Sequence, residues 1–448
     1  MNKRMYRARR LLVTVAVLLL AFASSAGAEE RIRDARGKNG MVASAHPLAS
    51  QVGVDILKAG GNAVDAAVAV GFALGVVEPN ASGIGGGGLM LIWLADSGRT
   101  VFIDFREKAP TGAAADMFEL DEEGSIKPDD RGFNPAVVGG RSVAVPGEVA
   151  GLLLAQQKFG SMARAQVMQP AIGLAEQGIT VSEVLAGLIA ENYDVLLGYP
   201  ESGAIYLSDD FPKSPGETVR NTDLAATLRL VAEQGRDGFY TGRVAQSIVN
   251  AVQADGGSIT MEDLAGYLPS YRAPVRGQYR GYDIVSSPPP SSGGAHVIEL
   301  LNIMEHYDLA AMGPDSADSL HAWGEAMKLA YADRAVFMGD SDFVLVPTEE
   351  LASKAYAKKR FELIDMDKAM PEYGAGDPTA GDSGSTTHYS VIDAAGNMVA
   401  CTKTINHFFG SGITAPGTGV LLNDQMDDFE KAPGGANSIE AGKKPLSS

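Results

Sequence analysis

One threonine of this 448-residue chain, Thr386, stands where a nucleophile or a processing site would stand. It follows the polar run "AGDSGS" and opens "TTHYSVID", in which polar and apolar residues alternate as in a β-strand. A threonine hydroxyl needs a neighbouring base before it can attack a carbonyl carbon. His388 would share a strand face with Thr386, but a histidine beside a strand is more often a hydrogen-bonded structural residue. From this segment alone, Thr386 could equally be an ordinary strand residue.

A hairpin would bring further polar groups beside Thr386. The run "DAAGN" is typical of a turn between two alternating segments, and a turn centred on Ala395 pairs Thr386 with Thr404. Alternation then puts Thr402, Thr404 and Asn406 on one face of the second strand. Two threonine hydroxyls would lie side by side with an amide close by, although threonine pairs are also common in sheets that have no catalytic role.

Two short matches to other motifs predict different chemistry and fail on context. "GIGGGG" fits the dinucleotide pattern G-x-G-x-x-G, with Asp104 about where a ribose-binding acid would lie. That motif follows a strand and opens a helix, whereas here a helix precedes and a strand follows, so we predict a tight turn. "GDSG", residues 381–384, resembles the nucleophile loop of trypsin-like proteases, but the single cysteine, Cys401, excludes their disulfide framework.

Composition indicates an exported globular protein. Residues 1–28 combine the basic run "MNKRMYRARR", the apolar stretch "LLVTVAVLLLAFA" and "SAGA", which predicts a signal peptide cleaved after Ala28. We therefore expect a periplasmic or secreted protein that is not held in a membrane after the signal is removed. The net charge of -18 argues against a nucleic-acid partner. One cysteine and six scattered histidines offer no metal-binding spacing, so no metal and no cofactor are expected.

Periodicity predicts a mixed α/β fold. Two packed helices separated by Gly60-Gly61 are expected in "GVDILKAGGNAVDAAVAVGFALGVVEP", and a β-hairpin in "LMLIWLADSGRTVFIDFRE". The segment from 340 to 385 is expected to be rich in loops. Helical periodicity extends over "GEVAGLLLAQQKFG", "DLAATLRLVAEQG", "RVAQSIVNAVQADGG", "AHVIELLNIMEHY" and "DSLHAWGEAMKLAYADRAVFM", and "ITMEDL" opens a further helix capped by Thr260.

Several motifs, in order, resemble one enzyme family. These are "AGGNAVDAAVAVGFALGVVEPNASGIGGGGLMLI", "IDFREKAP", "GRSVAVPGEVAGL", "PPPSSGG", "HAWGEAMKLAYADR", "TTHYSVIDAAGNMVACTKTIN", "LLNDQMDDF" and "KKPLSS". Together they are similar to the γ-glutamyltranspeptidases, also called glutathione hydrolases, from about residue 35 to the final serine. The resemblance implies an N-terminal nucleophile hydrolase fold, a four-layer αββα sandwich made as one precursor. Residues 29–385 would form the large subunit and residues 386–448 the small subunit.

The resemblance also implies roles for individual residues. Self-cleavage would fall between Ser385 and Thr386, and the freed α-amine, with a pKa of about 8, would serve as the base for the Thr386 hydroxyl. Thr404 would hydrogen-bond the nucleophile, and the fork of Arg106 would bind the α-carboxylate of the γ-glutamyl group. Without the resemblance, Arg106 would be read as a surface salt bridge. The family's remaining substrate contacts fall on Asn406, Gln425 and Asp428 for the α-ammonium group, and on the assisting serines Ser447 and Ser448.

The chain departs from the family pattern at several places. Asp424 stands where many members have asparagine, and Cys401 and His407 replace commoner residues; no change of function is attached to them. The segment between Phe429 and Pro445 is short beside members with a lid loop, which implies a more open pocket. The chain also stops before the glycine pair that forms the oxyanion hole in the family, so the small subunit is expected to be incomplete and the 448-residue chain inactive.

The expected activity is transfer of a γ-glutamyl group from glutathione or other γ-glutamyl compounds to water or to an amino acid or dipeptide. Two alternatives stay open. One is a cephalosporin or glutaryl acylase of the same family, against which Arg106 and Asp428 favour an amino-acid-like donor. The other is a secreted fragment without catalytic activity.

Overall fold

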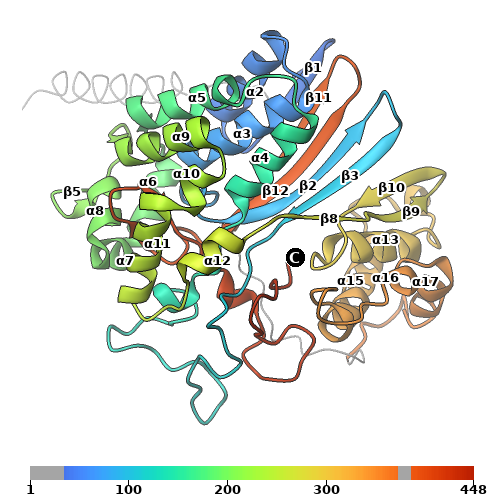
Figure 1. The fold of residues 1–448 in the computed structure, drawn as a ribbon. Helices are drawn as coiled ribbons and strands as arrows, with labels where there is room; N and C mark the ends of the chain where they lie inside the picture. The colour runs from blue at the N-terminus through green and yellow to red at the C-terminus, as the bar shows by residue number, and fades with distance from the viewer. Residues whose placement is uncertain (1–34, 372–384, 448) are drawn as a thin grey trace, which may run out of the picture. The chain divides into compact units, whose positions relative to one another are not determined.

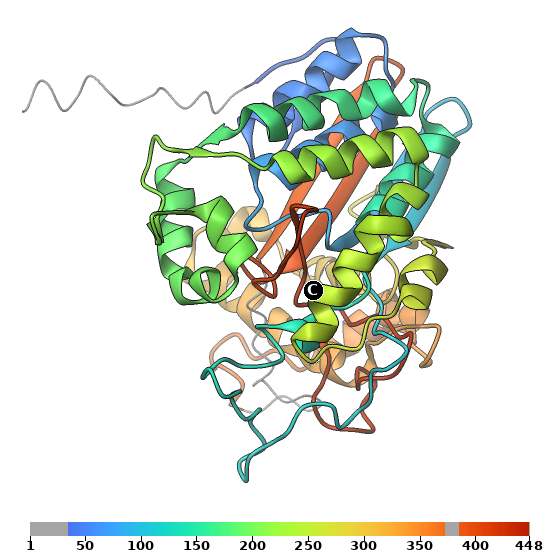
Figure 2. The same ribbon diagram turned by 60° about the vertical axis from the view of Figure 1, so that its left-hand side comes forward.

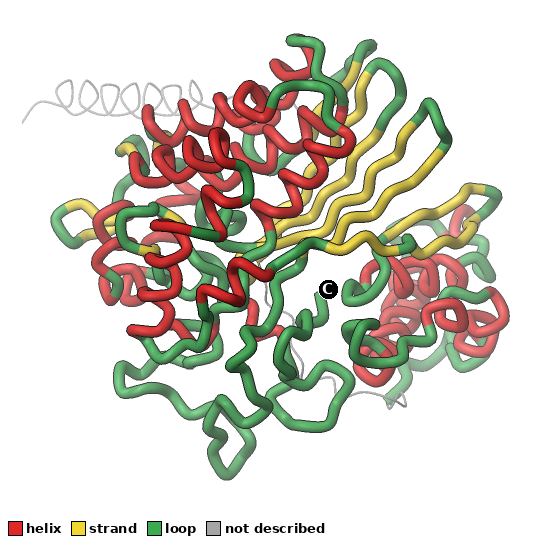
Figure 3. The backbone as a smooth tube through the Cα atoms, in the orientation of Figure 1, coloured by secondary structure: helices red, strands yellow, loops and turns green. Residues whose placement is uncertain are grey.

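The centre of the fold is an antiparallel sheet of six strands, in the order β1-β11-β12-β2-β3-β8. The computed structural model describes residues 35–371 and 385–447. Figure 3 shows these strands side by side as one sheet. They are β1 (Gly40–Ala43), β2 (Gly87–Leu94), β3 (Arg99–Phe105), β8 (Ser270–Arg272), β11 (Ser385–Asp393) and β12 (Met398–Asn406). The β2–β3 and β11–β12 hairpins confirm the two hairpins predicted from the alternating segments.

Helices cover one face of this sheet (Figures 1 and 2). The two helices predicted on either side of Gly60-Gly61 are α2 (Pro47–Lys58) and α3 (Ala63–Val77). Every residue of α3 is buried, because it packs on β11 and β12 on one side and on α2 and α5 (Arg164–Gln177) on the other. Asn62 caps α3 by accepting hydrogen bonds from two backbone N–H groups. The Ala- and Val-rich composition of α3 suits a position where large side chains have no room.

Among the remaining helices of this layer and its edges, those at Glu148–Phe159, Thr222–Gln234 and Gly242–Ala254 lie on predicted periodic runs, and Thr260 is the N-cap of the helix Met261–Gly266 as expected; the others were not predicted. The full set is α4 (Glu148–Phe159), α6 (Glu183–Glu191), α7 (Tyr193–Gly198), α8 (Pro200–Tyr206), α9 (Thr222–Gln234), α10 (Asp237–Tyr240), α11 (Gly242–Ala254) and α12 (Met261–Gly266), with the 3-10 helices η1 (Gly140–Ser142) and η2 (Gln425–Asp428). Short two-stranded sheets join β4 (Ile179–Thr180) to β7 (Thr218–Val219), β5 (Leu207–Ser208) to β6 (Phe211–Pro212), and β13 (Thr414–Ala415) to β14 (Val420–Leu421).

A second group of helices packs beside the hairpin of β9 (Val275–Tyr279) and β10 (Tyr282–Ser286). It contains α13 (Gly293–Met304), α14 (Leu309–Met312), α15 (Ala317–Phe337), α16 (Thr348–Leu351) and α17 (Lys354–Phe361). The last two are short helices in the segment from 340 to 385, which was expected to be rich in loops; the other described residues of that segment before Ser385 are in neither helix nor strand. Within α17, "KAYAKKRF", Ala357 is buried and Phe361 packs in the same apolar cluster, while Ser353 is the N-cap and Arg360 pairs with Asp333 of α15.

Two expectations fall on residues outside the described ranges, namely the signal peptide at residues 1–28 and the segment 372–384 that precedes Thr386. Within the described ranges, one large sheet is present of the two expected in the sandwich. No helix among these residues is long and apolar enough to cross a membrane.

Candidate active site

The β11–β12 hairpin brings Thr386 and Thr404 together in the register predicted from the turn. The two residues are paired across the ladder, and Thr386 Oγ1 lies 3.4 Å from Thr404 Oγ1. Thr386 is exposed, whereas Thr404 is buried. The ladder is irregular between Ser385 and Thr386, since the backbone of Ser385 is paired with Asn406. The hydroxyl of Thr386 is therefore held at the accessible beginning of a strand whose other residues are fixed in the sheet.

The glycine-rich turn lets the chain pass very close to this hairpin. A β-carbon on Gly86 would lie 2.0 Å from the carbonyl oxygen of Thr404, a distance that no side chain can occupy. The run "GIGGGG" is thus the close-packed turn that its helix-before-strand order predicted. Asp104, the residue at the ribose-binding position of the rejected motif, is buried in ion pairs with Arg272 and Lys444.

Arg106 follows β3 and lies in the interior of the protein. It is 2% exposed, and its Nη2 forms a close ion pair with Asp428. The guanidinium also donates to the carbonyl oxygens of Pro445 and Leu446, at 3.4 Å and 3.2 Å. The reading of Arg106 as a surface salt bridge is therefore wrong, because this arginine pairs with a carboxylate in a site removed from bulk water.

The 3-10 helix η2 supplies the acidic side of the same site. Gln425 Nε2 donates to Asp428 Oδ2 at 2.7 Å, whereas Gln425 Oε1 is buried without a hydrogen-bond partner among the described residues. Asn406, at the end of β12, donates from Nδ2 to the carbonyl oxygen of Asp424 at 3.2 Å. A buried acceptor without a partner costs free energy, and a donor on a bound ligand would satisfy it.

Ser447 is held by a loop to which the sequence analysis assigned no role. Ser292 N–H donates to the carbonyl oxygen of Ser447 at 2.9 Å, and Ser447 N–H donates to the carbonyl oxygen of Pro290 at 3.0 Å. The loop is the motif "PPPSSGG", which contributed to the family resemblance without indicating that it contacts the chain at Ser447. Ser448 lies outside the described residues.

Seven of the predicted site residues line one pocket. They are Arg106, Thr386, Thr404, Asn406, Gln425, Asp428 and Ser447. His388 makes hydrogen-bonding contacts with Thr402 Oγ1 at 2.9 Å and Ser390 Oγ at 3.2 Å, as the structural interpretation of this histidine expected. The pocket thus combines an exposed hydroxyl with a buried cation and a partly buried anion, which suits acyl transfer from a substrate with a zwitterionic end.

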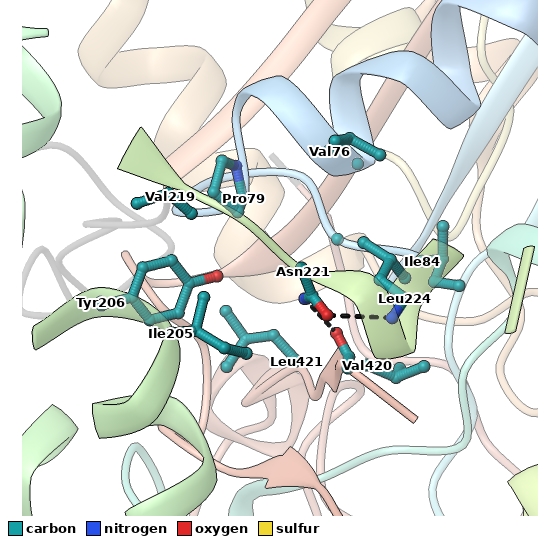
Figure 4. A pocket seen from close by; sticks show the side chains of 13 residues that line it. Val76, Pro79, Ile84, Ile205, Tyr206, Val219, Asn221, Leu224, Val420 and Leu421 are labelled. Carbon is teal, nitrogen blue, oxygen red and sulfur yellow. Dashed lines mark hydrogen bonds between the residues drawn. The ribbon is translucent and has the colours of Figure 1, made fainter. Parts of the chain in front are cut away.

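A second pocket, shown in Figure 4, has a different character. Its walls are mainly apolar and include Val76, Ile84 and Leu421. The amide of Asn221 is already used, because it donates to the carbonyl oxygen of Gly419 and accepts from Leu224 N–H, both at 2.9 Å. Its polar side chains are those of Asn221 and Tyr206, and none of its described lining residues is charged, so it lacks the paired charges of the first pocket.

Sequence reasoning missed two ionisable features beside the main pocket. Glu107, next to Arg106, is fully buried, and this burial raises the pKa of its carboxyl to about 8. Its Oε2 lies 3.5 Å from Arg106 Nη1. His407 and Asp424 form an ion pair next to Asn406 and Gln425, with Nδ1 and Oδ2 separated by 2.6 Å. The sequence analysis noted His407 and Asp424 only as departures from the family pattern. A residue that can be cationic and an acidic residue at these two positions were the signal that could have predicted the ion pair.

Comparison with known proteins agrees with this geometry. The family profile of gamma-glutamyltranspeptidase matches residues 49–448. A glutathione hydrolase proenzyme of Escherichia coli is 47% identical over 438 residues, which covers 95% of this chain and 74% of that protein. The crystal structure of Helicobacter pylori gamma-glutamyltranspeptidase is 44% identical with a TM-score of 0.72, covering 78% of this chain and 100% of that one.

A more distant relative represents the acylases. The crystal structure of a cephalosporin acylase from Bacillus halodurans is 31% identical with a TM-score of 0.81, covering 94% of this chain and 76% of that one. The fold is therefore the N-terminal nucleophile hydrolase fold that the motifs implied. On both the sequence match and the structural match, the chain belongs to the γ-glutamyltranspeptidase family.

Proposed function

We propose that this protein is a self-cleaving γ-glutamyltransferase and glutathione hydrolase, with Thr386 as its nucleophile. The observation that carries the proposal is one pocket in which Thr386 and Thr404 lie 3.4 Å apart, Oγ1 to Oγ1, beside the ion pair of buried Arg106 with partly buried Asp428. The names of the relatives, glutathione hydrolase proenzyme and gamma-glutamyltranspeptidase, describe the same chemistry.

Self-cleavage would prepare the catalyst. Thr386 Oγ1 attacks the carbonyl carbon of Ser385, the peptide bond breaks, and the acyl group moves to the hydroxyl as an ester. Water then hydrolyses the ester, which leaves a carboxylate on Ser385 and a free α-amine on Thr386. An amine with a pKa of about 8 can accept the hydroxyl proton at neutral pH, whereas a peptide nitrogen cannot.

In turnover the same hydroxyl attacks the γ-carbonyl carbon of the donor. The α-amine of Thr386 takes the hydroxyl proton and passes it to the departing amine, so a γ-glutamyl ester on Thr386 remains. Water or the amine of an amino acid or dipeptide then attacks this ester and releases the hydroxyl. Thr404 orients the nucleophile through the contact between the two hydroxyls.

The charges in the pocket match the α-amino acid end of a γ-glutamyl group. The α-carboxylate would pair with Arg106, and the α-ammonium group with Asp428 and the free acceptor Gln425 Oε1. Asn406 would add a contact to the ammonium group, and Ser447 and Ser448 would assist at the carboxylate. A zwitterion supplies one opposite charge to each member of the Arg106–Asp428 pair, so neither is left buried without a partner.

Acylase activity is the second candidate, because a cephalosporin acylase shares the fold with a TM-score of 0.81. A glutaryl group has no α-ammonium group and would leave Asp428 without a new partner. We therefore expect higher kcat/KM for a γ-glutamyl anilide than for the matched glutaryl anilide, and the reverse order would favour the acylase.

We further propose that residues 29–385 form the large subunit and that residues 386–448 belong to the small subunit of the processed protein, which is exported under the direction of residues 1–28. The test uses the full-length protein, Thr386→Ala, and Thr180→Ala as a matched control, since Thr180 is an exposed threonine on strand β4. Wild type and control should separate into two chains on a denaturing gel, with the smaller beginning Thr-Thr-His-Tyr, and should release anilide. Thr386→Ala should remain one inactive chain. Any other amino-terminal sequence, or cleavage of Thr386→Ala, would refute Thr386 as the nucleophile.

A further inference from the structure

His407 and Asp424 connect the two segments that line the ammonium side of the pocket. The carboxylate of Asp424 accepts two hydrogen bonds from His407, one from the backbone N–H at 3.0 Å and one from ring Nδ1 at 2.6 Å. The backbone of Asp424 makes two more contacts with the end of β12, because its N–H donates to Ile405 and its carbonyl oxygen accepts from Asn406 Nδ2, both at 3.2 Å. Four hydrogen bonds thus join residues 405–407 to one aspartate.

The backbone of Asn406 explains why such a connection is needed. Its φ angle is 76°, in the left-handed region that non-glycine residues adopt at a cost. Asparagine tolerates this conformation better than most residues, but surrounding contacts must still hold it. The hydrogen bond from His407 N–H to Asp424 fixes the peptide that follows Asn406. The contact from Asn406 Nδ2 to the Asp424 carbonyl fixes its side chain.

Charge strengthens the connection between these residues. Asp424 is fully buried, while the His407 side chain is 24% exposed. The hydrogen bond to Asp424 raises the pKa of His407 to about 9, so the ring is an imidazolium at neutral pH. The other charged groups facing it are Asp427, whose Oδ2 lies 3.9 Å from Nε2, and Asp428; Lys431 Nζ lies 3.3 Å from Asp427 Oδ1. His407 is thus a cation that faces three carboxylates, those of Asp424, Asp427 and Asp428.

We propose that His407 and Asp424 are positioning residues for the donor site. Their ion pair holds Asn406 and Gln425 at the separation that receives the α-ammonium group of a γ-glutamyl donor. This inference rests on the proposed function. The pair itself touches neither the nucleophile nor the scissile bond, so its loss should weaken donor binding and leave chemistry and self-cleavage nearly unchanged.

The test compares His407→Ala, Asp424→Ala and the double variant in the full-length protein, with steady-state kinetics on L-γ-glutamyl-p-nitroanilide. Each single variant should raise KM about five- to tenfold with kcat within about twofold. The double variant should be no worse than Asp424→Ala alone, because each single change already removes the shared contact. Asp424→Asn keeps an acceptor for the His407 N–H, so it should fold and raise KM less than alanine. His321→Ala, which removes a ring contact of 2.8 Å to the carbonyl oxygen of Asp365, is the matched control and should leave KM unchanged.

A second measurement monitors the His407–Asp424 ion pair independently of catalysis. In ring ¹⁵N NMR, His407 should keep its proton to a pH of about 9 in wild type and lose it near the ordinary histidine value of about 6.5 in Asp424→Asn. Additive KM effects, an unchanged KM, or a kcat loss equal to the KM effect would each overturn the positioning role. Unprocessed or unfolded Asp424→Asn would assign the pair to the fold instead. A wild-type protein that processes no γ-glutamyl anilide would overturn the proposed function, and this inference with it.

Discussion

Arg106→Lys is the substitution that tests donor recognition most directly. The guanidinium of Arg106 is buried, pairs with Asp428, and donates to the carbonyl oxygens of Pro445 and Leu446. Lysine retains the positive charge but presents it as a single ammonium group on a flexible stem. A substrate carboxylate that is bound by the two parallel N–H groups of a guanidinium would keep only one contact with lysine.

The expected magnitude follows from the loss of one charge-assisted hydrogen bond in a buried site. Such bonds contribute about 1.5–3 kcal/mol, and no discount for solvent screening applies to a side chain that is 2% exposed. At about 1.4 kcal/mol for each factor of ten, KM for a γ-glutamyl donor should rise roughly 10- to 150-fold. Self-cleavage should remain intact, because the hydroxyl of Thr386 and its partner Thr404 are unchanged.

The assay measures KM and kcat with L-γ-glutamyl-p-nitroanilide and follows processing on a denaturing gel. Arg229→Lys is the matched control, because Arg229 pairs with Glu176 on the surface, where the two side chains are 45% and 43% exposed. The control should behave as wild type. An unchanged KM in Arg106→Lys would remove Arg106 from the donor site. Accumulation of the uncut precursor would instead mean that its contacts with Pro445 and Leu446 are its main role.

Two further substitutions test the buried contacts that position the hairpin of Thr386 and Thr404. Lys403→Met leaves Glu148 buried without its ion-pair partner and should destabilise the protein by about 3–5 kcal/mol. Burial raises the pKa of Glu148 from 4.5 to about 7, so the folded state disfavours the carboxylate form. The decrease in Tm caused by Lys403→Met should therefore be larger at pH 8, where Glu148 is ionised, than at pH 5. An equal decrease at both pH values would contradict this. Gly86→Ala should block processing, because the new β-carbon would lie 2.0 Å from the Thr404 carbonyl oxygen. Gly187→Ala on α6, whose new β-carbon would have no atom within 4 Å, is the control and should be processed like wild type on a denaturing gel.

Local sequence rules were sufficient for the hairpin that holds the two threonines. The strand period of two and the position of the turn fix which residues face each other, so the pairing of Thr386 with Thr404 followed from the sequence. The order of helix and strand around "GIGGGG" likewise identified a turn instead of a nucleotide site. In both cases the deciding interactions lie within a short stretch of chain, where backbone geometry leaves few alternatives.

Local rules were insufficient for α17 and for the burial of Arg106. The helix α17 contributes two residues, Ala357 and Phe361, to an apolar cluster, too few to reveal a helical period in the sequence, and it packs on α13 and α15. Arg106 was assigned to the donor site only through family resemblance, since an arginine after a strand is usually a surface residue. Its burial depends on the segment 445–447 closing over it, far away in the chain.

The sequence by itself therefore determined the hairpin that pairs Thr386 with Thr404, the α/β class and, through its motifs, the family. The tertiary structure alone decided how the binding groups converge. Arg106 forms an ion pair with Asp428, and His407 forms one with Asp424. Ser447 accepts a backbone hydrogen bond from Ser292. The physical reason is that strand and helix periods are set by neighbouring residues, whereas a buried ion pair forms only when the whole fold brings its two members together and excludes water around them.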